Sequence, residues 1–239
     1  MKKTIFIRIG ILLSLIFSVV EAQEIVIGDL LTPESEIKIS SISEDIVELN
    51  NTIKVSQNEI SLIREVVSKF PMIKGLDNLL LNTKISKDEV EDRFFIQPIS
   101  EDGNKFILGK YVKLYIGLDK KNIWLQFKIQ YEEDDWLFID SFKIVADKYK
   151  WDSGYCKFER DNGSGSIWEW LDTEATREFI KVSEKISNSE KTIIRFSGDK
   201  YYSDFIVPEN QKIQLKKMLG LYLILNNNMK SKQQKKKVK

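Results

Sequence analysis

The chain has 239 residues, of which 42% are hydrophobic, and it carries a formal net charge of +1. It contains no histidine and one cysteine, which excludes Ser-His-Asp and Cys-His catalysis, histidine-ligated metal sites and any disulfide within the chain. Six lysines and no acidic residue occupy the last ten positions, so the body of the chain is mildly acidic and lacks the spread of basic side chains that a specific nucleic-acid-binding surface needs.

Residues 1–22 have the pattern of a signal peptide. A positively charged start precedes an apolar run from Ile9 to Val20, which is too short to span a bilayer comfortably. A small-residue site ending at Ala22 predicts cleavage before Gln23. An uncleaved membrane anchor is the alternative interpretation. We therefore expect an exported protein, periplasmic or extracellular, without a lipid anchor because no cysteine lies at the cleavage site.

Residues 23–87 are predicted to form an extended lead-in followed by an amphipathic helical segment. Apolar side chains recur from Ile46 to Phe70 at alternating spacings of three and four, which is a heptad pattern with one polar gap. Two interpretations follow: self-association through residues 46–70, or a helix that packs on its own domain. Pro71 is expected to end this helix.

Residues 88–228 are predicted to form an antiparallel β-rich domain, because the hydrophobic period changes to two. Short turns between consecutive strands favour a meander, and Asp102-Gly103 is a strong hairpin signal. The fold class is thus α+β and mainly β: an antiparallel β-sandwich-like meander with an N-terminal amphipathic helix and two further helices. The expected strands are residues 93–96, 112–116, 123–131, 136–146, 149–158 and 166–170.

The strand at residues 136–146 is apolar on both faces at its start, so we expect it to be central in its sheet. Asp140 interrupts its apolar face. An unpaired buried carboxylate is costly, so Asp140 is expected to be either solvated at an edge or paired, where it reaches a donor or water.

The C-terminal part is predicted to begin with a helix near Asp172 or Thr173. The spacing of four apolar residues gives this helix one buried stripe. A hairpin of residues 193–196 and 201–206 should follow. The residues of the stripe are Ala175, Phe179, Val182 and Ile186.

The last helix is predicted to open at Pro208 and to end at the three asparagines of residues 226–228. Residues 229–239 are predicted to be a disordered basic tail that folding does not need. The tail would either be solvated without a partner or bind acidic envelope polymers or lipid head groups.

The order of motifs from Ile85 to Tyr222 resembles an uncharacterised β-rich domain of hypothetical bacterial envelope proteins and lipoproteins. The resemblance implies the β-rich fold and a location in the envelope, and it implies no activity, cofactor or catalytic residue. This chain lacks the lipid-bearing cysteine of the lipoprotein members. The motifs are Ile85-Ser86-Lys87-Asp88, Leu114-Tyr115-Ile116-Gly117, Trp124-Leu125 to Tyr131, Asp135-Trp136-Leu137-Phe138-Ile139, Trp168-Glu169-Trp170, and Arg195-Phe196-Ser197-Gly198-Asp199-Lys200-Tyr201-Tyr202-Ser203-Asp204.

Trp168-Glu169-Trp170 is the sharpest candidate for a ligand site. On a strand, both indoles face one side and Glu169 faces the other. Exposed indoles could stack on sugar rings or hold a cation. The alternative is a tryptophan pair in the hydrophobic core.

The remaining candidates are weaker. Residues 132–135 are four consecutive acids that could bind calcium, although their spacing is that of a solvated turn. Glu169 and Asp135 could form the carboxylate pair of a glycoside hydrolase. Arg195 is expected to pair with Asp204 or Asp199 across its hairpin. Cys156 is expected to be a half-buried thiol on a strand, with an intermolecular bridge as the alternative.

These observations predict an exported, non-enzymatic envelope protein with a structural or binding role and no cofactor. A glycan-binding module that uses Trp168 and Trp170 is the first alternative. A histidine-free carboxylate hydrolase is the second. Solvent-exposed, coplanar indoles in a groove would favour the first alternative, and two carboxylates about 5 to 10 Å apart in a cleft would favour the second.

Overall fold

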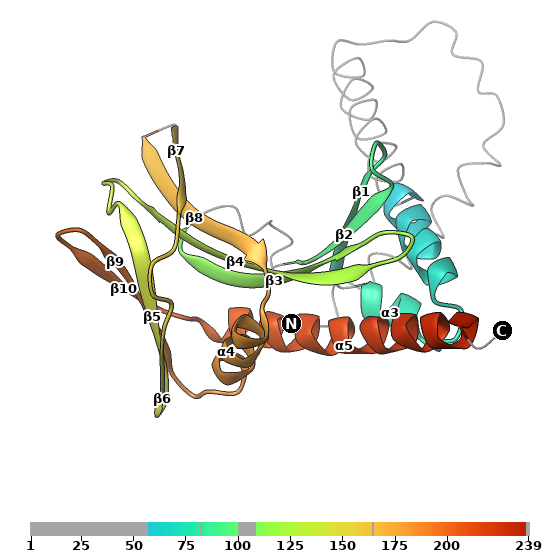
Figure 1. Cartoon of the computed structure of the whole chain (residues 1–239). Helices are drawn as coiled ribbons and strands as arrows, with labels where there is room; N and C mark the ends of the chain where they lie inside the picture. Colours follow the sequence, from blue (N-terminus) through green and yellow to red (C-terminus); the bar gives the residue numbers. More distant parts are fainter. Residues whose placement is uncertain (1–56, 82, 100–108, 164, 238–239) are drawn as a thin grey trace, which may run out of the picture. The chain divides into compact units, whose positions relative to one another are not determined.

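A computed structural model of the chain describes residues 57–81, 83–99, 109–163 and 165–237 (Figure 1). The predicted signal peptide, the lead-in and the Asp102-Gly103 hairpin lie outside the described residues. The described part consists of two antiparallel sheets and several helices, so the predicted mainly β, α+β fold is confirmed. None of its helices combines the length and the hydrophobicity that a membrane crossing requires.

The larger sheet has six strands in the order β1-β2-β3-β4-β8-β7. Its first four strands form the predicted meander, and β8 then pairs with β4 in an antiparallel ladder. Alternation places Leu125, Phe127 and Ile129 of β4 in the core, as the period of two predicted. The strands are β1 (Thr83–Asp88), β2 (Arg93–Pro98), β3 (Tyr111–Leu118), β4 (Ile123–Glu133), β7 (Glu159–Gly163) and β8 (Ser166–Glu174).

The smaller sheet has four strands in the order β10-β9-β5-β6, with β5 in an interior position as expected. The chain enters this sheet after β4 and returns to the larger sheet at β7. The prediction of a single meander is therefore wrong for this part of the chain. The strand predicted at residues 149–158 is shorter than expected: its first four residues form β6, and residues 153–158 are a connection to β7 in which Gly154 has a φ of +61°. The strands are β5 (Ile139–Ala146), β6 (Tyr149–Asp152), β9 (Thr192–Gly198) and β10 (Tyr202–Ile206).

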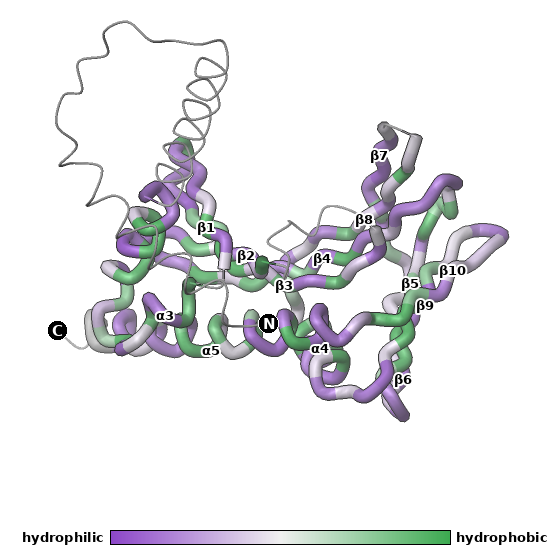
Figure 2. Tube along the Cα trace, turned by 180° about the vertical axis from the view of Figure 1, so that it is seen from behind, coloured by the Kyte–Doolittle hydropathy of each residue, from purple (hydrophilic) through white to green (hydrophobic). Residues whose placement is uncertain are grey.

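Aromatic rings from both sheets form the core between them. The rings of Phe127 in β4 and Phe142 in β5 are stacked, with centroids 6.3 Å apart. The ring centroid of Tyr131 lies 5.6 Å from that of Phe196 in β9. Figure 2 shows the hydrophobic and hydrophilic residues in alternation along β3 and β4. This pairing of inner faces is the sandwich-like part of the fold.

Helix α4 (Arg177–Ser187) begins later than predicted. Thr176 caps it by accepting a hydrogen bond from Phe179 N at 3.3 Å, while residues 172–174 remain in β8. Val182 and Ile186 of the predicted stripe are fully buried. Pairing with β4 therefore extends β8 into the residues that were predicted to form the first turn of the helix.

Helix α5 (Glu209–Lys237) covers the inner face of β3 and β4, and Figure 1 shows it running beneath these strands. The helix does not end at the three asparagines, so the prediction of a disordered tail is wrong for residues 229–237. Met229 packs against the core, and Lys232 Nζ donates to the carbonyl oxygen of Lys69. Gln233 Nε2 donates to Lys121 O at 2.9 Å. These tertiary contacts stabilise a segment whose own composition would not keep it ordered.

The heptad pattern is described from residue 57 on, where residues 57–69 form a helix. Of its heptad positions, Phe70 is fully buried, Ile63 and Val67 pack against the same core, and Ile60 is 45% exposed. This part of the pattern packs on its own domain. The short helix α3 (Leu76–Leu80) follows and buries Leu76 and Leu80.

Removal of residues 229–239 is expected to lower the melting temperature, because it deletes the contacts of Met229 and Lys232. A loss of about 1.5 kcal/mol would correspond to a shift of about 3–6 °C in a domain of this size. Circular dichroism melts of chains 23–228 and 23–239 measure this shift. An unchanged melting temperature would mean that the end of α5 does not contribute to folding.

Candidate functional site: the aromatic face of the six-stranded sheet

The two tryptophans of β8 lie outside the hydrophobic core. Trp168 and Trp170 are each half-buried and face away from the core, whereas Glu169 between them is 0% exposed and faces inward. The alternative of a tryptophan pair in the core is therefore wrong. The strand places both indoles on the outer face of the larger sheet.

Directly opposed residues in an antiparallel pair point to the same side, so the register identifies the neighbours of the indoles. Gln130 of β4 lies opposite Trp170, and Lys128 lies opposite Asp172. On the other side of β4, Lys128 also lies opposite Lys113 of β3. We call this side of the sheet the aromatic face; its residues are Phe95, Tyr111, Lys113, Tyr115, Trp124, Gln126, Lys128, Gln130, Trp168, Trp170 and Asp172.

A polar network links β3, β4 and β8 beside Trp170. Tyr115 OH donates to Asp172 Oδ1 at 2.8 Å, and Lys128 Nζ lies 3.7 Å from Asp172 Oδ2. The same ammonium lies 5.6 Å from the centroid of the Trp170 ring, within the range of a cation–π contact. Charged groups and an indole are therefore presented together, a combination suited to a ligand with both hydroxyl groups and apolar patches.

A second aromatic group lies further along the face. Phe95 is 6.3 Å from Tyr115 and 6.4 Å from Trp124 between ring centroids. The Trp124 indole covers Gly117, where an added Cβ would come within 2.1 Å of the ring. Glycine is required at this position to let the indole lie against the backbone.

Lys113 is the most perturbed cation of the face. Its Nζ donates to Gln97 Oε1 at 3.2 Å, and the structure shows no ion pair for it within the described residues. Burial, and next the charge of Lys128 opposite, lower the pKa of Lys113 to about 8. Burial also raises the pKa of Tyr111 and Tyr115 well above the usual range, with Asp172 adding to the shift.

Gln126 adds an unused acceptor to this face. Its Oε1 is buried and has no hydrogen-bond partner among the described residues. Tyr115 and Glu174 lie opposite Gln126 on the two neighbouring strands. A buried acceptor without a partner is costly, so this position lowers the stability of the fold.

The pKa of Lys113 predicts a pH dependence of stability. Between about pH 8 and the lysine value of 10.5 in the unfolded chain, unfolding takes up a proton, so the free energy of unfolding rises with pH. Wild type should therefore gain stability relative to Lys113→Met when the pH is raised from 7 to 9.5. Urea unfolding at each pH measures the difference, and Lys150→Met on the exposed side of β6 is the control. A difference that does not change with pH would contradict the burial of a charged Lys113.

Glu169 is held by four hydrogen bonds at the junction of the two sheets. Oε1 accepts from Leu137 N and Phe138 N, each at 2.8 Å, and Oε2 accepts from Ile139 N at 2.7 Å and Arg160 Nε at 2.9 Å. Arg160 Nη2 also donates to Ile139 O at 2.8 Å. Three successive backbone N–H groups around one anion form a nest. Glu169 thus ties β8 of the larger sheet to the start of β5 in the smaller one.

The structure of this junction shows that two predictions are wrong. Residues 136–138 are not part of a strand: β5 begins at Ile139, and Phe138 has a φ of +54° because its N–H turns toward Glu169. Glu169 is neither a ligand residue nor half of a hydrolytic pair with Asp135, because it has no exposed surface and both of its oxygens are occupied. Asp135 lies exposed in the turn before β5.

The junction also fixes its surroundings. The register of β5 against β9 shifts between Ile139 and Ser141, and Asp140 at this bulge accepts a hydrogen bond from Ser141 Oγ at 2.8 Å. The half-exposed Asp140 is therefore partnered, as predicted. A Cβ at Gly198 would lie 1.9 Å from Leu137 O, so only glycine fits opposite the turn.

Substitution Glu169→Gln is expected to lower the free energy of unfolding by about 3 kcal/mol, because an amide NH₂ would face the N–H of Ile139 and of Arg160. Glu174→Gln on the same strand is the control, since Glu174 is exposed and its change should stay within about 0.5 kcal/mol. Equilibrium urea unfolding compares the two. Equal stability of Glu169→Gln and wild type would overturn the role given to this carboxylate.

The other predicted sites have structural explanations. Glu132 accepts a hydrogen bond from Gly109 N at 2.6 Å, and Glu133 pairs with Lys110. Arg195 forms two hydrogen bonds with Asp204, at 2.6 and 2.7 Å, as one of the two predicted pairings. Among the described residues, no group of three or more acidic or cysteine side chains could hold a metal ion.

Cys156 is half-buried, as predicted, but it lies in the connection between β6 and β7 and not on a strand. Its backbone N donates to Asp140 O at 2.7 Å.

Sequence reasoning found the indoles but missed Lys113, Tyr115 and Asp172. The period of two along β4 places Lys128 and Gln130 on the side opposite Leu125, Phe127 and Ile129. The sequence does not give the order of the strands in the sheet. Strands β3 and β8 become neighbours of β4 only in the folded sheet, which is what brings these side chains together. Comparison with known proteins adds no further assignment, since no family model, no curated protein and no solved structure matches this chain.

Proposed function

We propose that this chain is an exported, non-enzymatic envelope protein whose aromatic face binds a glycan through Trp168 and Trp170. The observation that supports this most directly is the position of the two indoles. Both are large, both lie outside the core, and both lie on one strand face beside charged and hydrogen-bonding side chains. Large apolar side chains that the core does not use are typical of binding surfaces.

The chemistry of the face suits a sugar. A pyranose ring offers an apolar face that stacks on an indole and a rim of hydroxyl groups. Lys128 and Asp172 lie within reach of such hydroxyls because both are already anchored beside Trp170. The side chains one pair further along the ladder, Gln126 and Tyr115, extend the face for a chain of more than one sugar.

Binding is favoured over hydrolysis. Hydrolysis without histidine needs two carboxyl groups at a fixed separation on either side of the bond. Of the two nominated carboxyl groups, Glu169 is buried inside the junction, and Asp135 lies exposed in the turn before β5. The predicted signal peptide supports a ligand outside the cytoplasm, where envelope polysaccharides are found. Self-association through residues 46–70 and anion binding by the terminal lysines stay predictions.

Isothermal titration with chitohexaose and cellohexaose tests the proposal. Trp168→Ala and Trp170→Ala should each weaken binding about tenfold, which corresponds to the loss of one stacking contact of about 1.4 kcal/mol. The phenylalanine variants should retain part of the affinity. Tyr155→Ala is the control, because Tyr155 is 83% exposed and lies off the aromatic face.

Unchanged binding in both alanine variants would remove the indoles from the site. Absence of binding to either oligosaccharide, and to isolated cell-wall polysaccharide, would leave a structural role as the better interpretation.

A further inference from the structure

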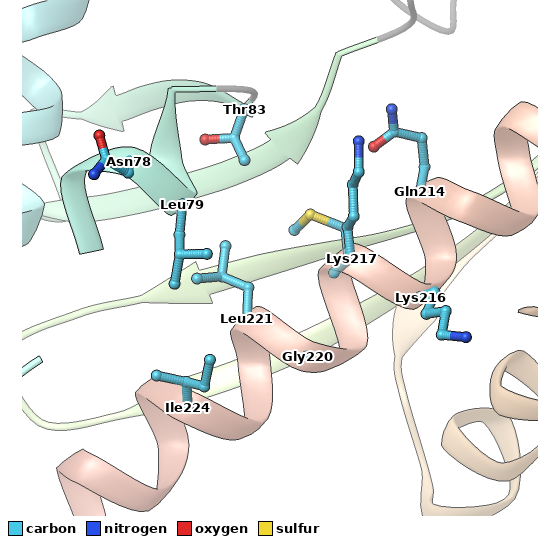
Figure 3. Close-up of a pocket in the computed structure, with 10 residues that line it drawn as sticks. Asn78, Leu79, Thr83, Gln214, Lys216, Lys217, Gly220, Leu221 and Ile224 are labelled. Atoms are coloured by element: carbon cyan, nitrogen blue, oxygen red, sulfur yellow. The ribbon is translucent and has the colours of Figure 1, made fainter. Parts of the chain in front are cut away.

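A cavity of about 270 Å³ lies between α3 and α5, next to the start of β1 (Figure 3). It is formed by elements that cover the inner face of the larger sheet, so it is separate from the aromatic face. Figure 3 shows Leu79 of α3 facing Leu221 and Ile224 of α5. The lining residues are Asn78, Leu79, Thr83, Gln214, Lys216, Lys217, Met218, Gly220, Leu221 and Ile224.

The floor and walls of the cavity are apolar. Met218 and Leu221 form a buried floor, at 1% and 6% exposure, while Leu79 and Ile224 keep 48% and 41% of their surface exposed. A Cβ added at Gly220 would meet nothing within 4 Å. Because Gly220 is itself exposed, this leaves a gap that is open to solvent, and two exposed aliphatic side chains, Leu79 and Ile224, border it. An occupant with a hydrocarbon part would cover surface that is costly to leave in water.

The polar end of the cavity is cationic. Lys216 and Lys217 belong to the lining, which contains no acidic residue. Neither lysine forms an ion pair with another residue in the described part of the chain. Lys217 precedes Leu221 by one helical turn and Ile224 by two turns. Its methylene groups therefore continue the row of apolar side chains on α5, and its ammonium group lies at the end of that row. Charge complementarity thus selects an anion at this end.

We propose that this cavity binds a single-chain amphiphile with an anionic head group, of the fatty-acid class. The hydrocarbon chain would lie between Leu79 and Ile224 over the Gly220 gap, and the carboxylate would pair with Lys217. The volume is below the range of about 300–1,000 Å³ typical of larger ligand pockets, which favours one acyl chain over a two-chain lipid. No covalent step is involved.

Isothermal titration of the chain lacking residues 1–22 with decanoate tests this site. We expect one decanoate per chain. Gly220→Leu should abolish binding by filling the gap, and Ile224→Trp is a second filling variant in case the first does not fold. Lys217→Met should weaken decanoate binding about tenfold and leave decanol binding unchanged. Lys181→Met on the exposed side of α4 is the charge control.

Several results would overturn the proposal. They are the absence of decanoate binding, equal affinity of folded filling variants and wild type, and equal affinity of wild type for decanoate and decanol. Binding to phosphatidylglycerol vesicles without binding to free decanoate would also overturn it, because the surface would then recognise a membrane and not a single chain.

Discussion

The hydrogen bonds of Glu169 are the interaction on which the rest of this structure depends. One carboxylate of the larger sheet accepts three backbone N–H groups from the start of the smaller sheet, and Arg160 supplies the compensating charge. The positive φ of Phe138, the bulge after Ile139 and the need for glycine at position 198 all follow from this contact. A buried charge is tolerated here because each of its oxygens is fully hydrogen-bonded.

The same contact determines what faces solvent. Because side chains alternate along a strand, fixing Glu169 inward forces Trp168 and Trp170 outward. A slip of one residue would bury both indoles and expose the carboxylate, and it would lose all four hydrogen bonds at once. The register of β8 therefore couples the packing of the two sheets to the composition of the aromatic face. The cavity beside α5 does not depend on this register, because α3 and α5 form it on the other side of the sheet.

Local sequence patterns predicted the strands that have one apolar and one polar face. They failed where a residue distant in the sequence determines the backbone conformation. The alternation in residues 123–131 predicted β4. Trp168-Glu169-Trp170 predicted that the two indoles share one side of the strand, but not whether that side faces the core. Residues 136–138 are apolar and resemble a strand, yet the N–H groups of Leu137 and Phe138 bind a carboxylate about thirty positions away. Three asparagines resemble a helix end, yet Met229 and Lys232 find tertiary partners beyond them. Non-local contacts of this kind leave no periodic signal in the sequence.

Neighbouring positions of β8 differ in how freely their side chains can be substituted. A change at position 169 must be matched by changes at 160 and in the turn before β5, so drift there is tightly constrained. Positions 168 and 170 contribute nothing to the core, and other side chains can replace them without disturbing the junction. Substitutions on alternate residues of one strand could therefore change the chemistry of the aromatic face in descendants of this chain, while the architecture is inherited unchanged.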